Sequence, residues 1–307
     1  MHAMAVVLQE PERLTLSSVS LQPPSDEDVV VDVEWSGIST GTERLLWTGR
    51  MPPFPGLGYP LVPGYESVGR VVEGTETLKA GTPVFVPGSN SFVDVRGLFG
   101  GAASRLVVSE SRAIPIADGL GERGVLLALA ATAEHALGDC VPDLIVGHGV
   151  LGRLLARLSV ARGGDPVVWE TEALRSSGAE GYRVLHPEED AKNDYRTIVD
   201  VSGDASIFDQ LVMRLARNGE IVLAGFYSDR VNFAFPPAFM KEARFRVAAE
   251  WQPGDLVTVN SMVERGELSL DGLITHRHLA TEAEAAYGRA FSDPRCLKML
   301  LDWRDVG

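Results

Sequence analysis

A glycine-rich turn near the middle of the chain has the residue types and the spacing that bind a dinucleotide. A strand predicted over residues 143–147 leads into Gly147, Gly149 and Gly152, and a predicted helix follows. In this fingerprint the first glycine makes the tight turn, the second lets the backbone approach a pyrophosphate, and the third lets the helix pack on the strand. The free N–H groups and the positive dipole end of the helix would bind the phosphates.

An acidic residue stands close to the position that the fingerprint requires. Glu170 ends the next apolar run, 23 residues after Gly147, where a carboxylate accepts hydrogen bonds from the adenosine ribose. Its charge would repel a 2′-phosphate, so we expect NAD rather than NADP as cofactor. The alternative is a glycine-rich turn in another α/β fold, and the acid and the order of elements argue against it. Further residues expected at the cofactor are His148, which would flank the pyrophosphate, and Val150, Leu151, Ser202, Gly203 and Gly225.

The composition is that of a globular enzyme and excludes several classes of protein. The chain has 307 residues, of which 45% are hydrophobic and 23% charged, with a formal net charge of −14. Such a negative charge argues against a nucleic-acid partner. The first ten residues lack the pattern of a signal peptide, and no apolar run is long enough to span a bilayer. The two cysteines, Cys140 and Cys296, exclude a disulfide framework and a multi-cysteine metal site. We expect a cytoplasmic protein without a membrane span, and a homodimer is compatible with the sequence.

The pattern of apolar residues changes once along the chain. Residues 1–122 contain short alternating runs separated by glycine, proline and polar residues, which predicts a β-rich, partly closed sheet. From residue 123, predicted strands alternate with predicted helices, which indicates a doubly wound parallel sheet. We therefore expect one domain from residues 1–122 and 266–307, and a second from residues 123–265. In the second domain we expect helices over 125–138, 151–162, 205–219 and 253–268, another helix between 170 and 197, and strands over 143–147, 166–170, 197–203 and 220–226.

Several segments carry a resemblance to a known family. The landmarks are GISTGTER (37–44), PGYESVGRVVEG (63–74), KAGTPV (79–84), the glycine fingerprint and THRHLATEAEAAY (275–287). With these, the chain resembles the medium-chain dehydrogenase/reductase superfamily over essentially its whole length. The resemblance implies a GroES-like catalytic domain first, a Rossmann domain in the middle, and a chain end that returns to the catalytic domain.

The sequence departs from this family where zinc would bind. Zinc-dependent members carry a cysteine in the first landmark and a histidine in the second, and this chain has Ser39-Thr40 and Tyr65 there. The lobe that holds four cysteines around a structural zinc is also missing. Because zinc needs three or four nitrogen, sulfur or carboxylate ligands, we expect no metal. The alternative is a rearranged set made of Glu43, Glu66 and His135.

Within the superfamily, residues 36–71 and 147–158 resemble a branch that works in bacteriochlorophyll biosynthesis. That branch oxidises the 3-(1-hydroxyethyl) group of a bacteriochlorophyllide to 3-acetyl. The resemblance implies an NAD-dependent secondary alcohol dehydrogenase, without zinc, whose substrate is a large flat tetrapyrrole. Two alternatives remain: a zinc-free NAD(P)H quinone or enoyl reductase, which Glu170 argues against, and a non-catalytic NAD-binding regulatory protein.

Oxidation of a secondary alcohol needs a group that takes the hydroxyl proton. Tyr65 stands where a zinc ligand is lost, so we expect it to point at the reacting carbon; its alternative role is to fill the empty zinc position. Ser39 and Thr40 could pass the proton outward. Glu43 or Glu66 could accept it, although Glu66 could instead form a structural ion pair, such as one with an arginine. His135 is the remaining catalytic candidate, and a structural histidine is the alternative there.

The segment 47–60 is rich in proline, glycine and aromatic residues and could form an apolar slot for the tetrapyrrole. We expect Trp47, Phe54 and Tyr59 to stack on the planar ring. Arg44 and Arg50 would bind its propionate carboxylate. The alternative is an ordinary proline-rich surface loop.

Overall fold

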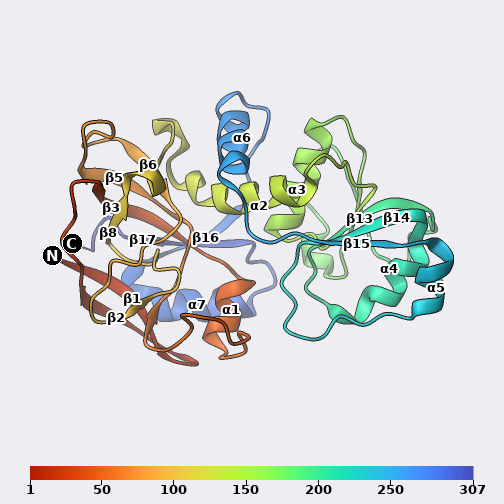
Figure 1. Ribbon diagram of the computed structural model, residues 1–307, viewed down its shortest axis with the longest axis horizontal. Coiled ribbons are helices and arrows are strands. Elements are labelled where there is room, and N and C mark those ends of the chain that lie inside the picture. The colour runs from red at the N-terminus through yellow and green to blue at the C-terminus, as the bar shows by residue number, and fades with distance from the viewer. Residues whose placement is uncertain (307) are drawn as a thin grey trace. The chain divides into compact units, whose positions relative to one another are not determined.

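The computed structural model describes residues 1–306 and divides the chain into two compact units (Figure 1). Of the described residues, the first unit contains 1–128 and 271–306, and the second contains 129–270. The boundaries expected from the sequence, 122/123 and 265/266, lie a few residues earlier. In residues 1–306 no helix is both long enough and apolar enough to cross a membrane.

The first unit is rich in β-structure, as the short alternating runs predict. A four-stranded sheet has the order β2-β1-β4-β7, and a seven-stranded sheet has the order β16-β17-β3-β5-β6-β9, with β8 paired to β3. The bounds are β1 (His2–Glu10), β2 (Arg13–Ser20), β3 (Asp28–Ile38), β4 (Leu61–Val62), β5 (Ser67–Glu73), β6 (Pro83–Val86), β7 (Arg96–Gly97), β8 (Arg105–Ser109), β9 (Ile114–Pro115), β16 (Ile274–Leu279) and β17 (Lys298–Asp302), with helices α1 (Thr42–Trp47) and α7 (Ala283–Ser292).

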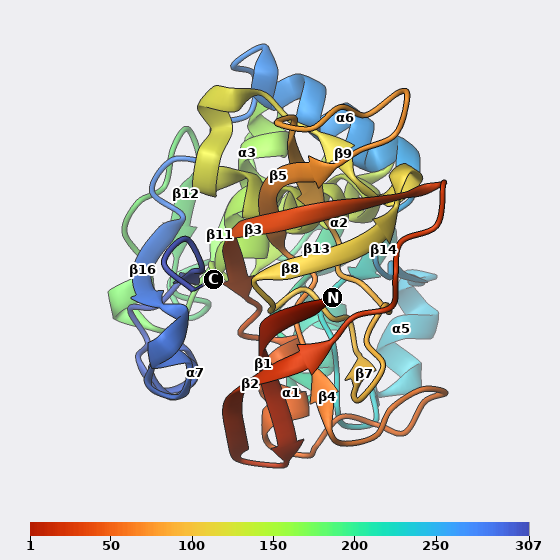
Figure 2. The ribbon, with the colours of Figure 1, turned by 90° about the vertical axis from the view of Figure 1, so that its left-hand side faces the viewer.

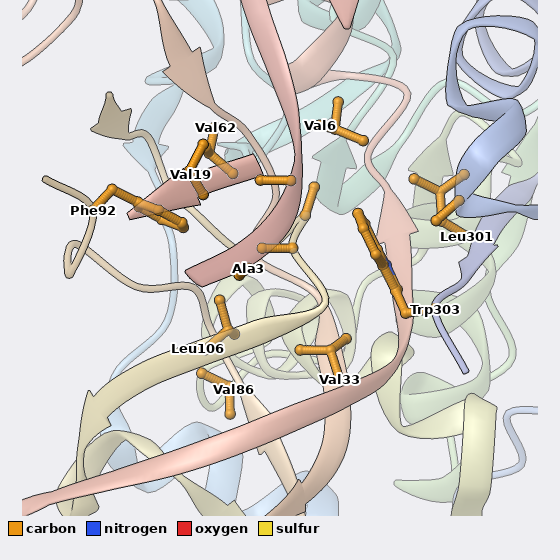
Figure 3. Close-up of a cluster of buried hydrophobic side chains, with 14 of the residues drawn as sticks. Ala3, Val6, Val19, Val33, Val62, Val86, Phe92, Leu106, Leu301 and Trp303 are labelled. Atoms are coloured by element: carbon orange, nitrogen blue, oxygen red, sulfur yellow. The ribbon is translucent and has the colours of Figure 1, made fainter. Parts of the chain in front are cut away.

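The chain end completes this unit. β17 pairs antiparallel with β3, which begins 28 residues from the start of the chain, and Figure 2 shows β3 and β8 side by side. In the core drawn in Figure 3, Trp303 lies among side chains from several strands, including Val6 and Val33. Its indole Nε1 donates to the Ser36 hydroxyl at 2.8 Å. The last residues are therefore structural parts of the first unit.

The second unit is a parallel sheet with the order β12-β11-β10-β13-β14-β15. Numbered in chain order within the sheet, this is 3-2-1-4-5-6, the order of dinucleotide-binding folds. The expected α/β fold, with a β-rich domain and a doubly wound parallel sheet, is confirmed. The bounds are β10 (Leu144–Val146), β11 (Val167–Trp169), β12 (Arg183–Leu185), β13 (Tyr195–Asp200), β14 (Leu215–Leu223) and β15 (Arg244–Val247), with α2 (Leu127–Leu137, which begins in the first unit), α3 (Val150–Ala161), α4 (Phe208–Arg214), α5 (Phe235–Lys241) and α6 (Pro253–Glu264).

The helix predicted between residues 170 and 197 is wrong. Before β13 begins at Tyr195, that stretch contains a three-residue turn of 3₁₀-helix, Ala173–Arg175, and the short strand β12. Gly178 and Gly181 both adopt positive φ angles, of +81° and +80°. Such backbone conformations interrupt a right-handed helix. The segment therefore runs as a loop.

The helix predicted over 205–219 is too long. α4 ends at Arg214, and β14 begins at once with Leu215, which pairs with Tyr195 of β13. Leu215 is fully buried in an extended conformation. Burial of this leucine against the sheet outweighs the helical tendency of the segment.

Candidate active site

The three fingerprint glycines each occupy a position that fits its expected role. Gly147 follows β10 with a φ of +103°, which makes the turn. A Cβ atom on Gly152 would lie 1.8 Å from the carbonyl oxygen of Gly147, so only glycine allows helix α3 to start so close to the strand. Gly149 faces open space. The turn is therefore tight, closely packed, and accessible at its middle glycine.

Glu170 lies at the carboxyl end of β11, beside this turn. One carboxylate oxygen accepts from the backbone N–H of His148 at 3.0 Å, and the other accepts from that of Glu172 at 2.8 Å. The side chain is partly exposed. Its position next to the fingerprint fits the predicted contact with a ribose.

The His148 ring is not part of the accessible surface of the turn. The residue is fully buried, with Nδ1 2.6 Å from the carbonyl oxygen of Arg175 and Nε2 2.8 Å from the hydroxyl of Tyr182. Burial lowers the pKa of the imidazole to about 4. The expectation that His148 flanks a pyrophosphate can therefore hold for its backbone only.

The remaining cofactor candidates line the same edge of the sheet. Ser202 and Gly203 follow β13, and Gly225 follows β14, while Val150 and Leu151 begin helix α3. Asp200, at the end of β13, is fully buried and accepts from the backbone N–H of Ser202 at 2.9 Å. The sequence reasoning missed this aspartate, which fixes the turn after β13. Because parallel strands end at one edge of a sheet, these residues gather beside the fingerprint.

A cluster of hydroxyl groups forms in the first unit around Ser39 and Tyr65. The Tyr65 hydroxyl lies 2.5 Å from the Ser39 hydroxyl and is also hydrogen-bonded to the side chain of Thr42. Ser39 is buried, whereas Tyr65 and Thr40 are partly buried. Burial, together with the nearby Glu66 carboxylate, raises the pKa of Tyr65 above its ordinary value. Sequence reasoning named Tyr65, Ser39 and Thr40 but missed Thr42.

Glu66 forms a buried ion pair, but its partner is a lysine rather than an arginine. The Nζ atom of Lys298 lies 2.6 Å and 2.8 Å from the two carboxylate oxygens of Glu66. Lys298 is 1% exposed and Glu66 is fully buried. Lys298 stands in β17, 232 residues further along the chain. A lysine directly before the apolar run 299–301 is the sequence signal that could have pointed to it.

Glu43 is a second buried carboxylate beside the hydroxyl cluster. It accepts from the backbone N–H of Ser39 at 2.9 Å and from the hydroxyl of Tyr287 at 2.6 Å. Burial raises its pKa to about 7. Tyr287 belongs to α7, so the chain end holds this carboxylate as well.

The rearranged metal set of Glu43, Glu66 and His135 does not form in the structure. Both carboxylates are engaged by the partners just described, and His135 Nδ1 lies 3.0 Å from a carboxylate oxygen of Asp255 within the second unit. Across residues 1–306 the histidine, cysteine, aspartate and glutamate side chains form no group of three or more that could hold a metal.

The segment 47–60 only partly forms the surface that its sequence predicts. Trp47 is packed against the rings of Tyr287 and Phe291, at centroid distances of 6.3 and 6.4 Å. The Tyr59 hydroxyl donates to the carbonyl of Leu46. These two aromatic rings therefore support the fold instead of standing free to stack on a substrate. Of the expected substrate contacts, Phe54, Arg44 and Arg50 are exposed.

Comparison with known proteins places this geometry in a family. Residues 25–118 match the alcohol dehydrogenase GroES-like domain. The chain is 58% identical to the 2-desacetyl-2-hydroxyethyl bacteriochlorophyllide A dehydrogenase of Cereibacter sphaeroides, over 99% of both chains. It is 55% identical to the Rhodobacter capsulatus protein of the same name, over the full length of both.

The chain belongs to the family of 2-desacetyl-2-hydroxyethyl bacteriochlorophyllide A dehydrogenases. The resemblance found in the sequence is thereby confirmed. The fold of this dehydrogenase family is also that of acetophenone reductase from Geotrichum candidum in complex with NAD, with a TM-score of 0.85 at 19% identity and coverage of 99% of this chain and 98% of that one.

Proposed function

We propose that the protein oxidises the hydroxyethyl group of a bacteriochlorophyllide to an acetyl group, with NAD as the hydride acceptor and without zinc. The observation that carries this proposal is the 58% identity over 99% of both chains to a dehydrogenase named for that substrate. In this reaction the alcohol would lose a hydride, which NAD would accept, and a proton, so one NADH and one proton would form for each ketone. Conversion of the hydroxyethyl compound by the purified protein with NAD tests the proposal.

NAD is proposed over NADP because of Glu170. Its carboxylate stands beside the glycine turn, where it would accept from the ribose hydroxyls and repel a 2′-phosphate. A dinucleotide held at the fingerprint by its pyrophosphate would supply its nicotinamide as the hydride acceptor. The backbone N–H groups at the start of α3 would hold the pyrophosphate, with Gly149 leaving room for its approach.

The proton is proposed to leave through the hydroxyl cluster. Because burial and Glu66 raise the pKa of Tyr65, its neutral phenol predominates at neutral pH. A neutral phenol can pass a proton along a chain of hydrogen bonds by accepting one and donating another. Ser39, at 2.5 Å, and Thr42 are the partners for that transfer, and Thr40 lies next to Ser39. His135, held by Asp255, is the second candidate for a catalytic role.

Zinc-free chemistry follows from the side chains at the former ligand positions. Ser39, Thr40 and Tyr65 offer neutral hydroxyls, which are poor zinc ligands. We expect the purified, active protein to contain far less than one zinc ion per chain. Elemental analysis near one zinc per chain, with activity lost on chelation, would contradict this expectation.

The substrate is proposed to bind by way of the exposed part of the segment 47–60. Phe54 is 38% exposed and could stack on the tetrapyrrole, and Arg44 and Arg50 are exposed cations that could bind its carboxylate. Phe54→Ala should raise KM with kcat little changed, because stacking is present in both ground and transition states. Phe239→Ala, at a ring of the second unit that is 63% exposed, is the control and should leave KM unchanged.

We propose a homodimer because of the edge strand β15 of the second unit. β15 ends the six-stranded sheet, and Phe245 and Val247 on it are 37% and 74% exposed. The unpaired backbone of an edge strand is a template for pairing with a second copy, and on β15 the two apolar side chains alternate with Arg244 and Arg246. Val247→Glu should shift the sedimenting species from dimer to monomer. Val93→Glu, at a 60% exposed valine of the first unit, is the matched control.

Two alternative functions give different results in the same assays. A quinone or enoyl reductase would consume NADPH with an electron-poor alkene or quinone and leave the hydroxyethyl compound unchanged. A regulatory protein would bind NAD and turn over neither substrate. Cys140 and Cys296 form no disulfide, which fits the cytoplasm as the compartment in which we propose that the enzyme works.

A further inference from the structure

Arg153 in the first turn of α3 is committed to the loop that follows Glu170. The side chain is buried, with 5% exposure. Its guanidinium donates to the carbonyls of His148 at 3.1 Å, Gly178 at 3.1 Å, Arg175 at 2.9 Å and Ser177 at 2.8 Å. A guanidinium has five N–H groups. Four hydrogen bonds to backbone carbonyls therefore occupy most of what this cation can donate.

His148 and Tyr182 hold the far end of the same loop. A carbonyl oxygen only accepts, so the 2.6 Å contact between His148 Nδ1 and the carbonyl of Arg175 places the ring hydrogen on Nδ1. Nε2 must then accept from the Tyr182 hydroxyl at 2.8 Å. The low pKa that burial gives this imidazole keeps it neutral at physiological pH. The ring thus links the fingerprint turn to residue 182.

Glu170 holds the near end of the loop. Its carboxylate accepts from the backbone N–H of His148 on one side and from that of Glu172 on the other. The loop 171–182 is therefore tied at its start by Glu170, in its middle by Arg153, and at its end by Tyr182. Side chains from the fingerprint and α3 fix this loop, in a place where the expected helix is missing.

We propose that Arg153 is a positioning residue that sets cofactor selectivity, because the loop carbonyls withhold its guanidinium from a 2′-phosphate. A phosphate on the ribose beside Glu170 would meet the carboxylate, and the buried guanidinium of Arg153 would already be bonded to backbone carbonyls. At the same time, the fixed loop keeps the ribose site in one shape, which favours binding of the smaller cofactor. This inference rests on the proposed NAD-dependent function.

The geometry also says why lysine cannot replace this arginine. The four carbonyls surround a planar, forked donor, whereas an ammonium has three donors at one point. A Cβ atom on Gly178 would lie 2.6 Å from Nη1 of Arg153, which shows how closely the loop backbone approaches the guanidinium. Arg153→Lys therefore keeps the positive charge but cannot make the four hydrogen bonds to the backbone carbonyls.

The test is titration of NADH and NADPH into the purified full-length protein and its variants, followed by tryptophan fluorescence. We expect wild type to bind NADH at least about tenfold more tightly than NADPH. Arg153→Met and Arg153→Lys should both weaken NADH binding about tenfold, the equivalent of one lost hydrogen-bond network to a charged group. Both substitutions should also lower the ratio of the Kd for NADPH to the Kd for NADH at least about threefold. Tyr182→Phe removes one hydroxyl and little volume. It should weaken NADH binding and lower the preference for NADH over NADPH, in each case by less than the Arg153 substitutions do.

Arg162→Met is the matched control. Arg162 follows the other end of α3 and also donates to a backbone carbonyl, that of Gly138 at 2.8 Å. It should change stability but not cofactor preference. If Arg153→Lys, or Tyr182→Phe where the Arg153 variants do not fold, keeps the wild-type preference, the inference is overturned while the proposed function stands. A wild-type protein that binds no NADH would overturn both.

Discussion

The ammonium of Lys298 lies 2.6 Å from one carboxylate oxygen of Glu66 and 2.8 Å from the other, and the two residues are 232 positions apart in the chain. Both are excluded from solvent. The pair joins β17, at the chain end, to the segment that follows Tyr65. It thereby fixes the backbone beside the hydroxyl cluster and supplies the buried cation closest to Glu66.

Lys298→Met should destabilise the protein by about 3–5 kcal/mol, because it leaves an unpaired carboxylate in the core. Urea unfolding measures this change. The double variant Lys298→Met with Glu66→Gln should lose less free energy of unfolding than Lys298→Met alone, since no buried charge is left unpaired. Lys79→Met, at an exposed lysine, is the control. A loss below about 1 kcal/mol for Lys298→Met would show that the pair is not the structural link that we infer.

Glu43 should make stability fall as the pH rises. Its folded-state pKa, about 7, lies above the ordinary value of 4.5. A raised carboxyl pKa contributes stability that is present in full below about pH 4.5 and is lost as the pH rises through about 7. Glu43→Gln removes this dependence while keeping a polar side chain of similar shape.

The stability difference between Glu43→Gln and wild type should therefore move by about 2–3 kcal/mol in favour of the variant between about pH 5 and pH 8. Chemical unfolding at several pH values gives this difference. Glu34→Gln, at a partly exposed carboxylate of β3, serves as a control that should show a much smaller change. A difference that is constant with pH would mean that Glu43 is ionised throughout.

Tyr65→Phe should lower kcat roughly tenfold to a thousandfold, the range for loss of one proton-transfer or hydrogen-bonding group, while NADH affinity is retained. The variant keeps the ring, which packs edge-on against Phe99 at a centroid distance of 5.4 Å. Ser39→Ala should reduce kcat in the same way if the proton passes between the two hydroxyls. A near-normal kcat in Tyr65→Phe would show that the tyrosine only packs and takes no part in proton transfer.

Trp47→Ala should lower stability more than it changes substrate binding. The sequence alone suggests a stacking residue, for which KM would rise. In the structure the indole packs against Tyr287 and Phe291, so truncation leaves a cavity that we expect to cost about 3 kcal/mol. Thermal unfolding and KM measured together separate the two roles. A raised KM with unchanged stability would restore the role in substrate binding.

The parts of the fold that follow local rules were predictable from the sequence. β10, the glycine turn and α3 lie within a few residues of the prediction, because strand, turn and helix each have a local signature there. The loop 171–182 was not predictable, because its first residues favour a helix. Arg153, far from it in the sequence, satisfies its carbonyls instead.

In the candidate site, too, some residues were predictable from the sequence and others were not. Ser39 and Tyr65 could be named because the family resemblance matches them to zinc-ligand positions, and the structure brings their hydroxyls together. Lys298 and Tyr287 could not be named, because their contacts with Glu66 and Glu43 depend on how the chain end returns to the first unit. A single buried lysine or tyrosine leaves no periodic pattern in a sequence.

The most direct test of the proposed function is a single-turnover reaction of purified protein with NAD and the hydroxyethyl bacteriochlorophyllide. The absorbance of the tetrapyrrole and the amount of NADH are recorded together. The new acetyl carbonyl conjugates with the ring, so we predict a shift of the tetrapyrrole spectrum with one NADH formed per substrate converted. The same spectrum should shift much more slowly with NADP, because of Glu170. An unchanged spectrum in protein that binds NAD would contradict the proposed function.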